Sequence, residues 1–351
     1  MKKKNLSAKK RIHNFYSRKL EDPRIKRAYL NFKKKLSDHI SDANLCVAVS
    51  GGSDSMALSF LAKCYSLEKK KKVHFFIVDH KLRKNSTNEA KLVKKKLNSF
   101  QVICEILTIK KIKKLSNLQS VARYQRYDSI IKQSSKRKID YVLTAHHADD
   151  LIENFFIRLL RGSGLKGLIS FANIKSKVKF GDEIFILRPL INLSKKELKY
   201  ISENTFNFNV EDPSNLDDKF LRVKVRKLIL NLEKEGLTLN KFKLSLNNLN
   251  KSNNAIEYYV QKNINNNSKY LKLAKKVILK DEFLKQPDEI LFRSLSEVIQ
   301  KVGKKDTFAR GAKVENLIKF LRSFNNHKKK TLSGCIIQKL ENSVVISAEK
   351  S

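Results

Sequence analysis

Six consecutive residues carry the clearest chemical signal of this sequence: Ser50-Gly51-Gly52-Ser53-Asp54-Ser55. Two glycines let the backbone approach an oxyanion closely, and the three serines add hydroxyl donors. The loop lacks the lysine of a Walker A motif and the spacing of a Gly-x-Gly-x-x-Gly dinucleotide turn. These residues therefore predict a site for phosphate or pyrophosphate. A tight structural turn is the simpler alternative.

A second group of ionisable residues contains His146, His147, Asp149, Asp150 and Glu153. Asp150 and Glu153 are three residues apart, so on a helix their carboxylates share one face. Two interpretations stay open. The carboxylates could hold Mg²⁺ or attract a cationic amine, or Asp150 could be a helix N-cap with Glu153 at the third position. The spacing of the two histidines does not fit a zinc site.

Both groups follow apolar runs that are typical of buried parallel strands. We expect strands at residues 45–50, 73–79, 102–108 and 141–145, with helices at 56–68, 87–99 and 118–132 between them. This alternation predicts an α/β fold with a doubly wound parallel sheet, whose ligands bind at the carboxyl ends of the strands. The glycine loop and the acidic group both lie at such ends.

The chain is strongly basic. It has 351 residues, with 75 Lys and Arg against 34 Asp and Glu, a formal net charge of +41. This excess favours a nucleic-acid partner, with a solvated lysine-rich surface as the alternative. The four cysteines form no Cys-x-x-Cys pair, and no apolar stretch has the length of a membrane span. We therefore expect a cytoplasmic protein with no membrane contact.

We expect three regions along the chain. Residues 1–44 form a basic N-terminal arm that is partly helical, residues 45–232 form the nucleotide-binding domain, and residues 233–351 form a mostly helical appendage. Residues 177–187 contain Gly181-Asp182 between two apolar runs and predict a hairpin. Ser194 and Glu197 predict the capping box of a helix.

The ordered motifs resemble those of the tRNA(Ile)-lysidine synthases, which are N-type ATP pyrophosphatases, or PP-loop enzymes. The resemblance rests on segments 47–55, 78–83, 119–127, 145–168, 188–190 and 211–215, followed by Arg222 and Arg226. It implies the PP-loop fold, of the adenine nucleotide alpha hydrolase-like type. It also implies that the C-terminal appendage binds tRNA.

The resemblance implies a ligase that forms a carbon–nitrogen bond and converts ATP to AMP and pyrophosphate. With ATP and Mg²⁺ it would adenylate the C2 oxygen of the wobble cytidine of tRNA(Ile) with a CAU anticodon, and free L-lysine would displace AMP to give lysidine. Residues 50–55 would cradle pyrophosphate, and Asp54 would act in catalysis as a Mg²⁺ ligand. Asp150 and Glu153 would hold the lysine ammonium and help to deprotonate it.

Two pairs of arginines complete the expected site. Arg123 and Arg126 are three residues apart and could grip a nucleotide or RNA phosphate, or could form a solvated helix face. Arg222 and Arg226 are four residues apart, and salt bridging and tRNA contact are both open for them. The sequence indicates no stable protein partner other than a second copy of the chain.

The chain departs from the family pattern in three places. Leu151 and Asn154 stand where the family usually has Gln and Thr, Lys81 where it usually has Gly, and Val223 where it usually has Asn. Three other classes of protein are the alternatives to this one. They are a PP-loop tRNA-thiolating enzyme, a PP-loop synthetase that amidates a small metabolite, and a non-catalytic RNA-binding protein.

Overall fold

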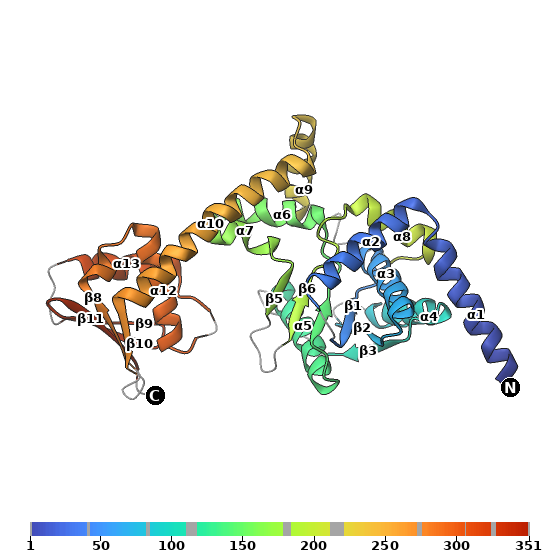
Figure 1. The fold of residues 1–351 in the computed structure, drawn as a ribbon, viewed down its shortest axis with the longest axis horizontal. Coiled ribbons are helices and arrows are strands. Elements are labelled where there is room, and N and C mark those ends of the chain that lie inside the picture. Colours follow the sequence, from blue (N-terminus) through green and yellow to red (C-terminus); the bar gives the residue numbers. More distant parts are fainter. Residues whose placement is uncertain are drawn as a thin grey trace. The chain divides into compact units, whose positions relative to one another are not determined.

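The structure is a computed structural model that describes residues 2–40, 43–81, 85–109, 118–177, 184–210, 221–271, 276–305, 307–323 and 328–349. The chain divides into two compact units, Met1–Lys243 and Leu244–Ser351. Figure 1 colours both units along the sequence. The expected sites all lie in the first unit.

A six-stranded sheet forms the centre of the first unit. Its strand order is β3-β2-β1-β4-β6-β5, and all neighbours are parallel except β5 and β6. The strands are β1 (Leu45–Val49), β2 (Val73–Asp79), β3 (Cys104–Thr108), β4 (Tyr141–Leu143), β5 (Lys175–Lys177) and β6 (Phe185–Leu187). This confirms the predicted doubly wound sheet. The strand order reverses between β1 and β4, and ligands of open α/β sheets bind at the carboxyl ends of the strands beside such a switch point.

Alternate residues of β1 pack on opposite faces of the sheet. Val47 and Val49 belong to a large core that includes residues of helices on one face, whereas Cys46 belongs to a smaller core with Ile130 and Ile131 on the other face. The continuous apolar run of β1 is thus explained by burial on both sides. This burial holds the residues that follow β1 in a fixed place.

Helices follow each of the first four strands, as the sequence predicted. They are α3 (Ser53–Lys69), α4 (Ser86–Ser99), α5 (Leu118–Lys136) and α6 (Ala148–Leu159). Further along lie α7 (Leu165–Ile169), the 3₁₀ turn η1 (Ser170–Ala172), α8 (Lys195–Thr205) and α9 (Leu221–Lys234). The helices α3 and α8 pack closely against one another.

Two helices precede the sheet: α1 (Lys2–Lys19) and α2 (Pro23–Ser37). Asp22 caps α2, and its carboxylate accepts hydrogen bonds from the N–H groups of Arg24 and Ile25. Tyr16 and Phe32 are fully buried, and the Tyr16 ring stacks on Phe60 of α3 at 5.3 Å. The region from α1 to α2 is therefore helical and is packed into the core of the first unit.

The predicted hairpin and capping box are both present. Strands β5 and β6 pair antiparallel, whereas residues 178–183 between them lie outside the described residues. At the start of α8, the Ser194 hydroxyl accepts from the Glu197 N–H, and the Ser194 N–H donates to the Glu197 carboxylate. Pro213 and its neighbours also lie outside the described residues.

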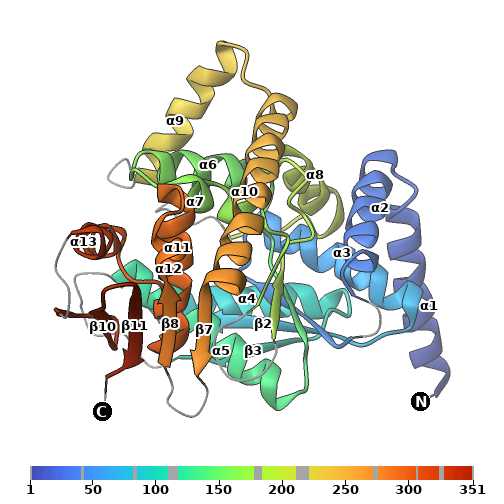
Figure 2. The same cartoon turned by 60° about the vertical axis from the view of Figure 1, so that its left-hand side comes forward.

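The second unit combines helices with an antiparallel sheet of order β7-β8-β11-β10-β9. Figure 2 labels β7, β8, β11 and β10 of this sheet. Its strands are β7 (Ser268–Leu271), β8 (Lys276–Lys280), β9 (Lys329–Leu332), β10 (Cys335–Lys339) and β11 (Ser343–Ala348). Its helices are α11 (Asp281–Leu284), α12 (Asp288–Val302) and α13 (Gly311–Arg322), after the long α10 (Leu239–Asn267) that begins in the first unit. A separate apolar core holds this unit together. Among the described residues, no helix has the length and apolarity to cross a membrane.

Candidate functional site

The glycine loop lies between β1 and α3, and Ser55 organises it. The Ser55 Oγ accepts hydrogen bonds from the N–H groups of Ser50 at 3.2 Å and Gly51 at 3.0 Å. It donates to the carbonyl of Gly52 at 3.0 Å. Ser55 is 3% exposed, so its hydroxyl is committed to the shape of the loop. We infer that Ser55 fixes the conformation of the glycine loop through these hydrogen bonds.

The two glycines have different reasons to be glycine. Gly51 has a φ of +90°, and a Cβ there would lie 2.6 Å from a methyl carbon of Val93. At Gly52 a Cβ would meet only the Ser50 Oγ, at 3.9 Å. Gly51 is therefore required by the fold, whereas Gly52 leaves open space at the helix start that an anion can approach.

The start of α3 has the electrostatics of an anion site. Gly52 is the N-cap, so the N–H groups of Ser53, Asp54 and Ser55 have no carbonyl partner within the helix. These groups and the helix dipole favour negative charge. The residues present therefore fit a bound phosphate or pyrophosphate group.

His147 joins this loop to the acidic group after β4. Its Nε2 lies 3.7 Å from Asp54 Oδ2 and 3.5 Å from Asp150 Oδ2, and its Nδ1 lies 3.4 Å from Asp149 Oδ2. Burial opposes a charge on this imidazole, but the three carboxylates outweigh burial and raise the pKa of His147. The imidazole therefore bridges two elements that the sequence could only place at the same sheet edge.

The acidic pair of α6 is occupied by arginines of α9. Arg222 contacts both Asp150 and Glu153, and the Nε of Arg226 lies 2.6 Å from Glu153 Oε1. Asp150 and Glu153 are 8% and 4% exposed. Burial opposes the charge of Asp150, yet His147 and Arg222 hold its pKa below the usual range. This geometry shows that the acidic pair can hold cationic groups.

The alternative prediction, that Asp150 is the N-cap of this helix, was wrong. The N-cap of α6 is His147, and Asp150 is the third residue, whose carboxylate accepts from the His147 N–H at 3.1 Å. Glu153 lies one turn further along and takes no part in the cap. The Leu151 and Asn154 departures do not disturb this arrangement, because Leu151 is buried and the Asn154 amide donates to the Asp150 carbonyl.

Lys195, the first residue of α8, also meets this site. Its Nζ lies 2.7 Å from Asp54 Oδ2, and its N–H donates to Asp149 Oδ2 at 2.8 Å. Burial opposes ionisation of Asp149, while His147 and the Lys195 N–H lower the pKa of this carboxyl group. The amino ends of α3, α6 and α8 therefore converge on one set of charged groups.

Arg188 and Arg123 lie close enough to His146 to act on its charge. Burial lowers the pKa of His146 to about 4, although Asp150 opposes the effect, and Arg188 and Arg123 add to it. The guanidinium of Arg123 lies over the Tyr127 ring at 5.5 Å and the side chain is exposed. Arg126 is half-buried. The contact of Arg123 or Arg126 with a phosphate stays a prediction.

At the end of β2, Asp79 is buried and holds the next turn together. Its carboxylate accepts hydrogen bonds from the hydroxyls of Ser86 at 3.0 Å and Thr87 at 2.7 Å, and from the Lys81 N–H at 3.2 Å. Burial opposes the charge, but these donors lower the pKa of Asp79. Lys81, which departs from the family pattern, has a φ of +50°, a value at which glycine is strain-free.

The structure thus brings together Asp54, Asp150, Glu153, Arg222 and Arg226. Sequence reasoning missed Lys195 and the bridging position of His147. A signal for Lys195 was present, since it follows the N-cap Ser194 directly, and the glycine loop lacks a lysine of its own. What the sequence did not contain was the packing of α8 on α3.

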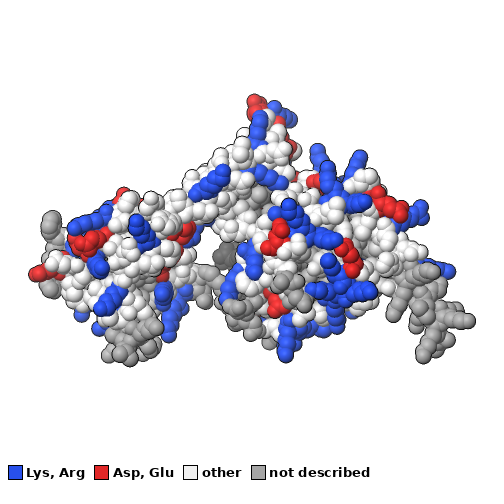
Figure 3. All heavy atoms as spheres, in the orientation of Figure 1, with Lys and Arg blue, Asp and Glu red and all other residues white. Residues whose placement is uncertain are grey.

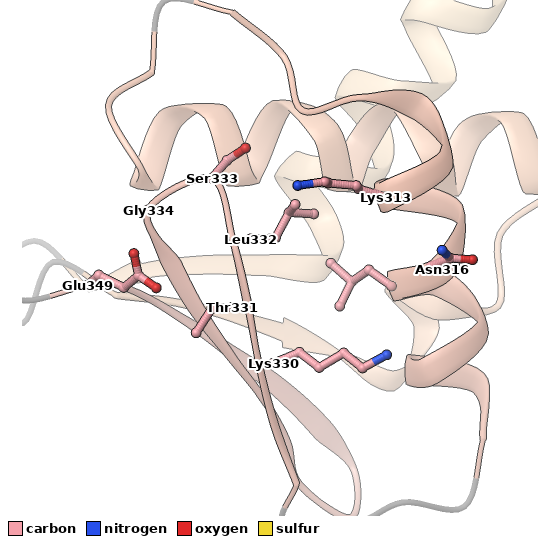
Figure 4. A pocket seen from close by; sticks show the side chains of 9 residues that line it. Lys313, Asn316, Lys330, Thr331, Leu332, Ser333, Gly334 and Glu349 are labelled. Atoms are coloured by element: carbon pink, nitrogen blue, oxygen red, sulfur yellow. The ribbon is translucent and has the colours of Figure 1, made fainter.

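The second unit has a hollow of its own, bordered by α13, β9 and the turn at Gly334 (Figure 4). Lys313 and Lys330 line it, with Glu349 as its acidic residue. Nowhere in the described part of the chain do three or more His, Cys, Asp or Glu side chains form a metal cage.

Comparisons with known proteins agree with this geometry. Residues 22–233 match the PP-loop domain family. The tRNA(Ile)-lysidine synthase of Orientia tsutsugamushi is 33% identical over 310 residues, which cover 84% of this chain and 67% of that protein. The synthase of Rickettsia typhi is 31% identical over 312 residues, 88% of this chain and 70% of that protein. The chain belongs to the tRNA(Ile)-lysidine synthase family.

The resemblance read from the motifs is therefore confirmed, and so is the PP-loop fold. A further lysidine synthase, from Rickettsia akari, is 30% identical over 339 residues, 92% of this chain and 74% of that protein. Among solved structures, the U34-tRNA thiolase NcsA of Methanococcus maripaludis has a TM-score of 0.53 and 17% identity, covering 64% of this chain and 79% of that one. At this identity the likeness to the thiolase concerns the fold alone.

Proposed function

We propose that the chain ligates free L-lysine to C2 of the wobble cytidine of tRNA(Ile) with a CAU anticodon, at the expense of ATP. The observation that carries this proposal is the position of His147. Its imidazole lies within 3.7 Å of carboxylates from both the phosphate loop and the acidic pair. The imidazole of His147 therefore lies between the proposed anion site at the phosphate loop and the proposed cation site at the acidic pair.

The first step would use the anion site. The cytidine C2 oxygen attacks the α-phosphorus of ATP, the bond from that phosphorus to the bridging oxygen breaks, and pyrophosphate leaves with the electron pair. Charge develops on the leaving group next to the amino end of α3. The N–H groups there stabilise it without reorganising.

The second step would use the acidic pair. The amino group of lysine attacks C2, the bond from C2 to oxygen breaks, AMP leaves, and the attacking nitrogen loses a proton. Asp150 and Glu153 already hold two guanidinium groups. A lysine ammonium at this place therefore competes with Arg222, whose side chain is 41% exposed.

Mg²⁺ is proposed as a further component. Asp54 presents its carboxylate at the amino end of α3, and Mg²⁺ is commonly held by one or two carboxylates together with phosphate oxygens. When bound, the ion would offset the charge of the phosphates. Asp54 is thus proposed as the Mg²⁺ ligand, and a cage of several protein ligands is not required.

The basic surface supports tRNA as the substrate. Lys and Arg side chains are spread across the visible face of each unit in Figure 3. The helices α1 and α2 belong to this surface, with Arg18, Lys26 and Lys34 exposed. We propose that they and the second unit contact the tRNA backbone. Because α2 also fills the core, charge substitutions test this better than a deletion of the arm would.

A thiolating enzyme of the same superfamily is the second candidate, and the cysteines argue against it. All four are buried as free thiols. Burial raises the pKa of Cys46 and Cys104 to about 12 and that of Cys335 to about 11, and it raises the pKa of Cys64 as well. Buried thiols of this kind are inert. The cytoplasmic location and a homodimer stay predictions.

The decisive experiment incubates the protein with ATP, Mg²⁺, radiolabelled lysine and an isoleucine tRNA that carries a CAU anticodon. We expect lysine transfer to this tRNA and none to methionine tRNA. Absence of transfer, or equal transfer to both tRNAs, refutes the proposal.

The variant Asp150→Asn separates the two steps. Asn can still accept from the His147 N–H, so the start of α6 is kept, but its charge is lost. We expect tRNA-dependent release of pyrophosphate to persist while lysine transfer falls at least 10-fold, the order expected for loss of a charged contact. Asp128→Asn, which removes a surface pair with Lys132, is the control. Full lysine transfer by Asp150→Asn would contradict the assigned role.

A further inference from the structure

Lys195 reaches from α8 to the phosphate loop. We propose that Lys195 supplies the positive charge that this loop lacks, by contacting the β- and γ-phosphates of ATP and the pyrophosphate that leaves. The inference rests on the proposed function and adds to it a residue from outside the loop. It assigns Lys195 the part that a lysine within the loop plays in Walker A enzymes.

The backbone of Lys195 is anchored while its side chain is accessible. The capping box of Ser194 and Glu197 begins α8 at this residue, and the Lys195 N–H donates to Asp149 at 2.8 Å. The Lys195 side chain is nevertheless 47% exposed. Its ammonium group can therefore change partner without a movement of the helix.

The present partner of the ammonium group marks the place where phosphates would bind. Nζ lies 2.7 Å from Asp54 Oδ2, and Asp54 is the second residue of α3. The N–H groups that fit an anion belong to this same turn. A Lys195 side chain that reaches Asp54 is therefore long enough to reach a phosphate group bound by the first turn of α3.

The negative charge of Asp54 beside the phosphate site explains why a cation such as Lys195 is needed there. A carboxylate beside a pyrophosphate site repels the ligand unless a cation offsets it. His147 is also close to Asp54, but it is buried and is shared by Asp149 and Asp150. Lys195 is the accessible cation that the structure pairs with Asp54 among the described residues. A merely structural ion pair at this exposure would contribute little to stability.

Equilibrium binding of pyrophosphate, ATP and AMP tests this, measured by calorimetry with Mg²⁺ present. Lys195→Gln should weaken binding of pyrophosphate and ATP by about 10- to 100-fold, as expected for loss of a charged hydrogen bond. AMP lacks the β- and γ-phosphates, so its affinity should change by no more than about twofold. Lys195→Arg should restore most of the loss, and Lys196→Gln, the exposed neighbour, should behave as the wild type.

The outcomes separate this inference from the proposed function. If the wild type binds neither ATP nor pyrophosphate, the proposed function fails. If the wild type binds both and Lys195→Gln binds them equally well, only the role of Lys195 is overturned. Equal losses for AMP and pyrophosphate also overturn it, because they indicate a general disturbance of the site. Should Lys195→Gln fail to fold, as circular dichroism would show, Lys195→Arg tests the same contact.

Discussion

Replacement of Ser55 by alanine should collapse the phosphate loop from within. The Ser55 hydroxyl accepts from two N–H groups and donates to one carbonyl within the loop, and the residue is 3% exposed. Alanine fits the space and keeps the helix propensity. The change therefore removes hydrogen bonds and little else.

The expected cost follows from the groups that are left unpaired. The N–H of Gly51 is buried, and an unsatisfied buried donor costs about 1–3 kcal/mol. The N–H of Ser50 is partly buried and recovers some hydration, so it adds less. We expect the free energy of unfolding to fall by about 2–4 kcal/mol. We also expect pyrophosphate affinity to fall at least 10-fold, because the cradle loses its shape.

Urea denaturation and calorimetric titration with pyrophosphate measure the two effects. Ser59→Ala is the matched control, since Ser59 is a fully buried serine of the same helix. Its hydroxyl donates to the Ser55 carbonyl at 2.7 Å, and its loss leaves no N–H group without a partner. We expect Ser59→Ala to cost about 1 kcal/mol or less and to bind pyrophosphate normally.

Equal stability losses in Ser55→Ala and Ser59→Ala would refute the reasoning. So would a Ser55→Ala protein that is destabilised as expected but binds pyrophosphate as tightly as the wild type. The first result would mean that the loop N–H groups find water. The second would mean that the loop does not need this hydroxyl to present its donors.

Four further substitutions test other parts of the site. Gly51→Ala should destabilise the protein by about 2 kcal/mol or more, because its Cβ would overlap Val93. Gly52→Ala should instead fold normally and lose pyrophosphate affinity. Urea denaturation and titration with pyrophosphate compare the two variants. Glu153→Gln should lower the free energy of unfolding by about 1–3 kcal/mol, since two guanidinium groups of α9 lose their charged partner, and an unchanged urea midpoint would contradict it. In the wild type the free energy of unfolding should fall as the pH falls from about 6.5 to about 4. Over this range His146 takes up a proton in the unfolded chain but stays neutral in the folded protein. His146→Gln should flatten this part of the pH profile, and a profile as steep as the wild type's would contradict the assignment.

Much of the first unit could be predicted from local patterns. The run from Leu45 to Val49 is continuously apolar, and a strand buried on both faces requires that. Gly51 and Gly52 marked the turn, and the helix that follows begins at Ser53, three residues before the predicted start at residue 56. Each of these signals is carried by neighbouring residues, so the chain order is enough to read them.

The second unit was harder to predict, because its sheet joins distant segments. Strand β8 pairs with β11, and neither has more than six residues. Short alternating runs such as these are easily taken for loops when their partners are unknown. The sequence predicted a mostly helical appendage, and it did not show the five-stranded sheet.

Part of the candidate site could be predicted from the sequence, and the rest depends on the tertiary structure. By itself, the sequence determined the loop of residues 50–55, the acidic pair of Asp150 and Glu153, and the family to which these motifs belong. The tertiary structure decided which cations meet these acids. Lys195 and Asp54 are 141 residues apart, and they meet because α8 packs on α3. Side-chain contacts over such separations depend on strand order and helix packing, which no local pattern encodes.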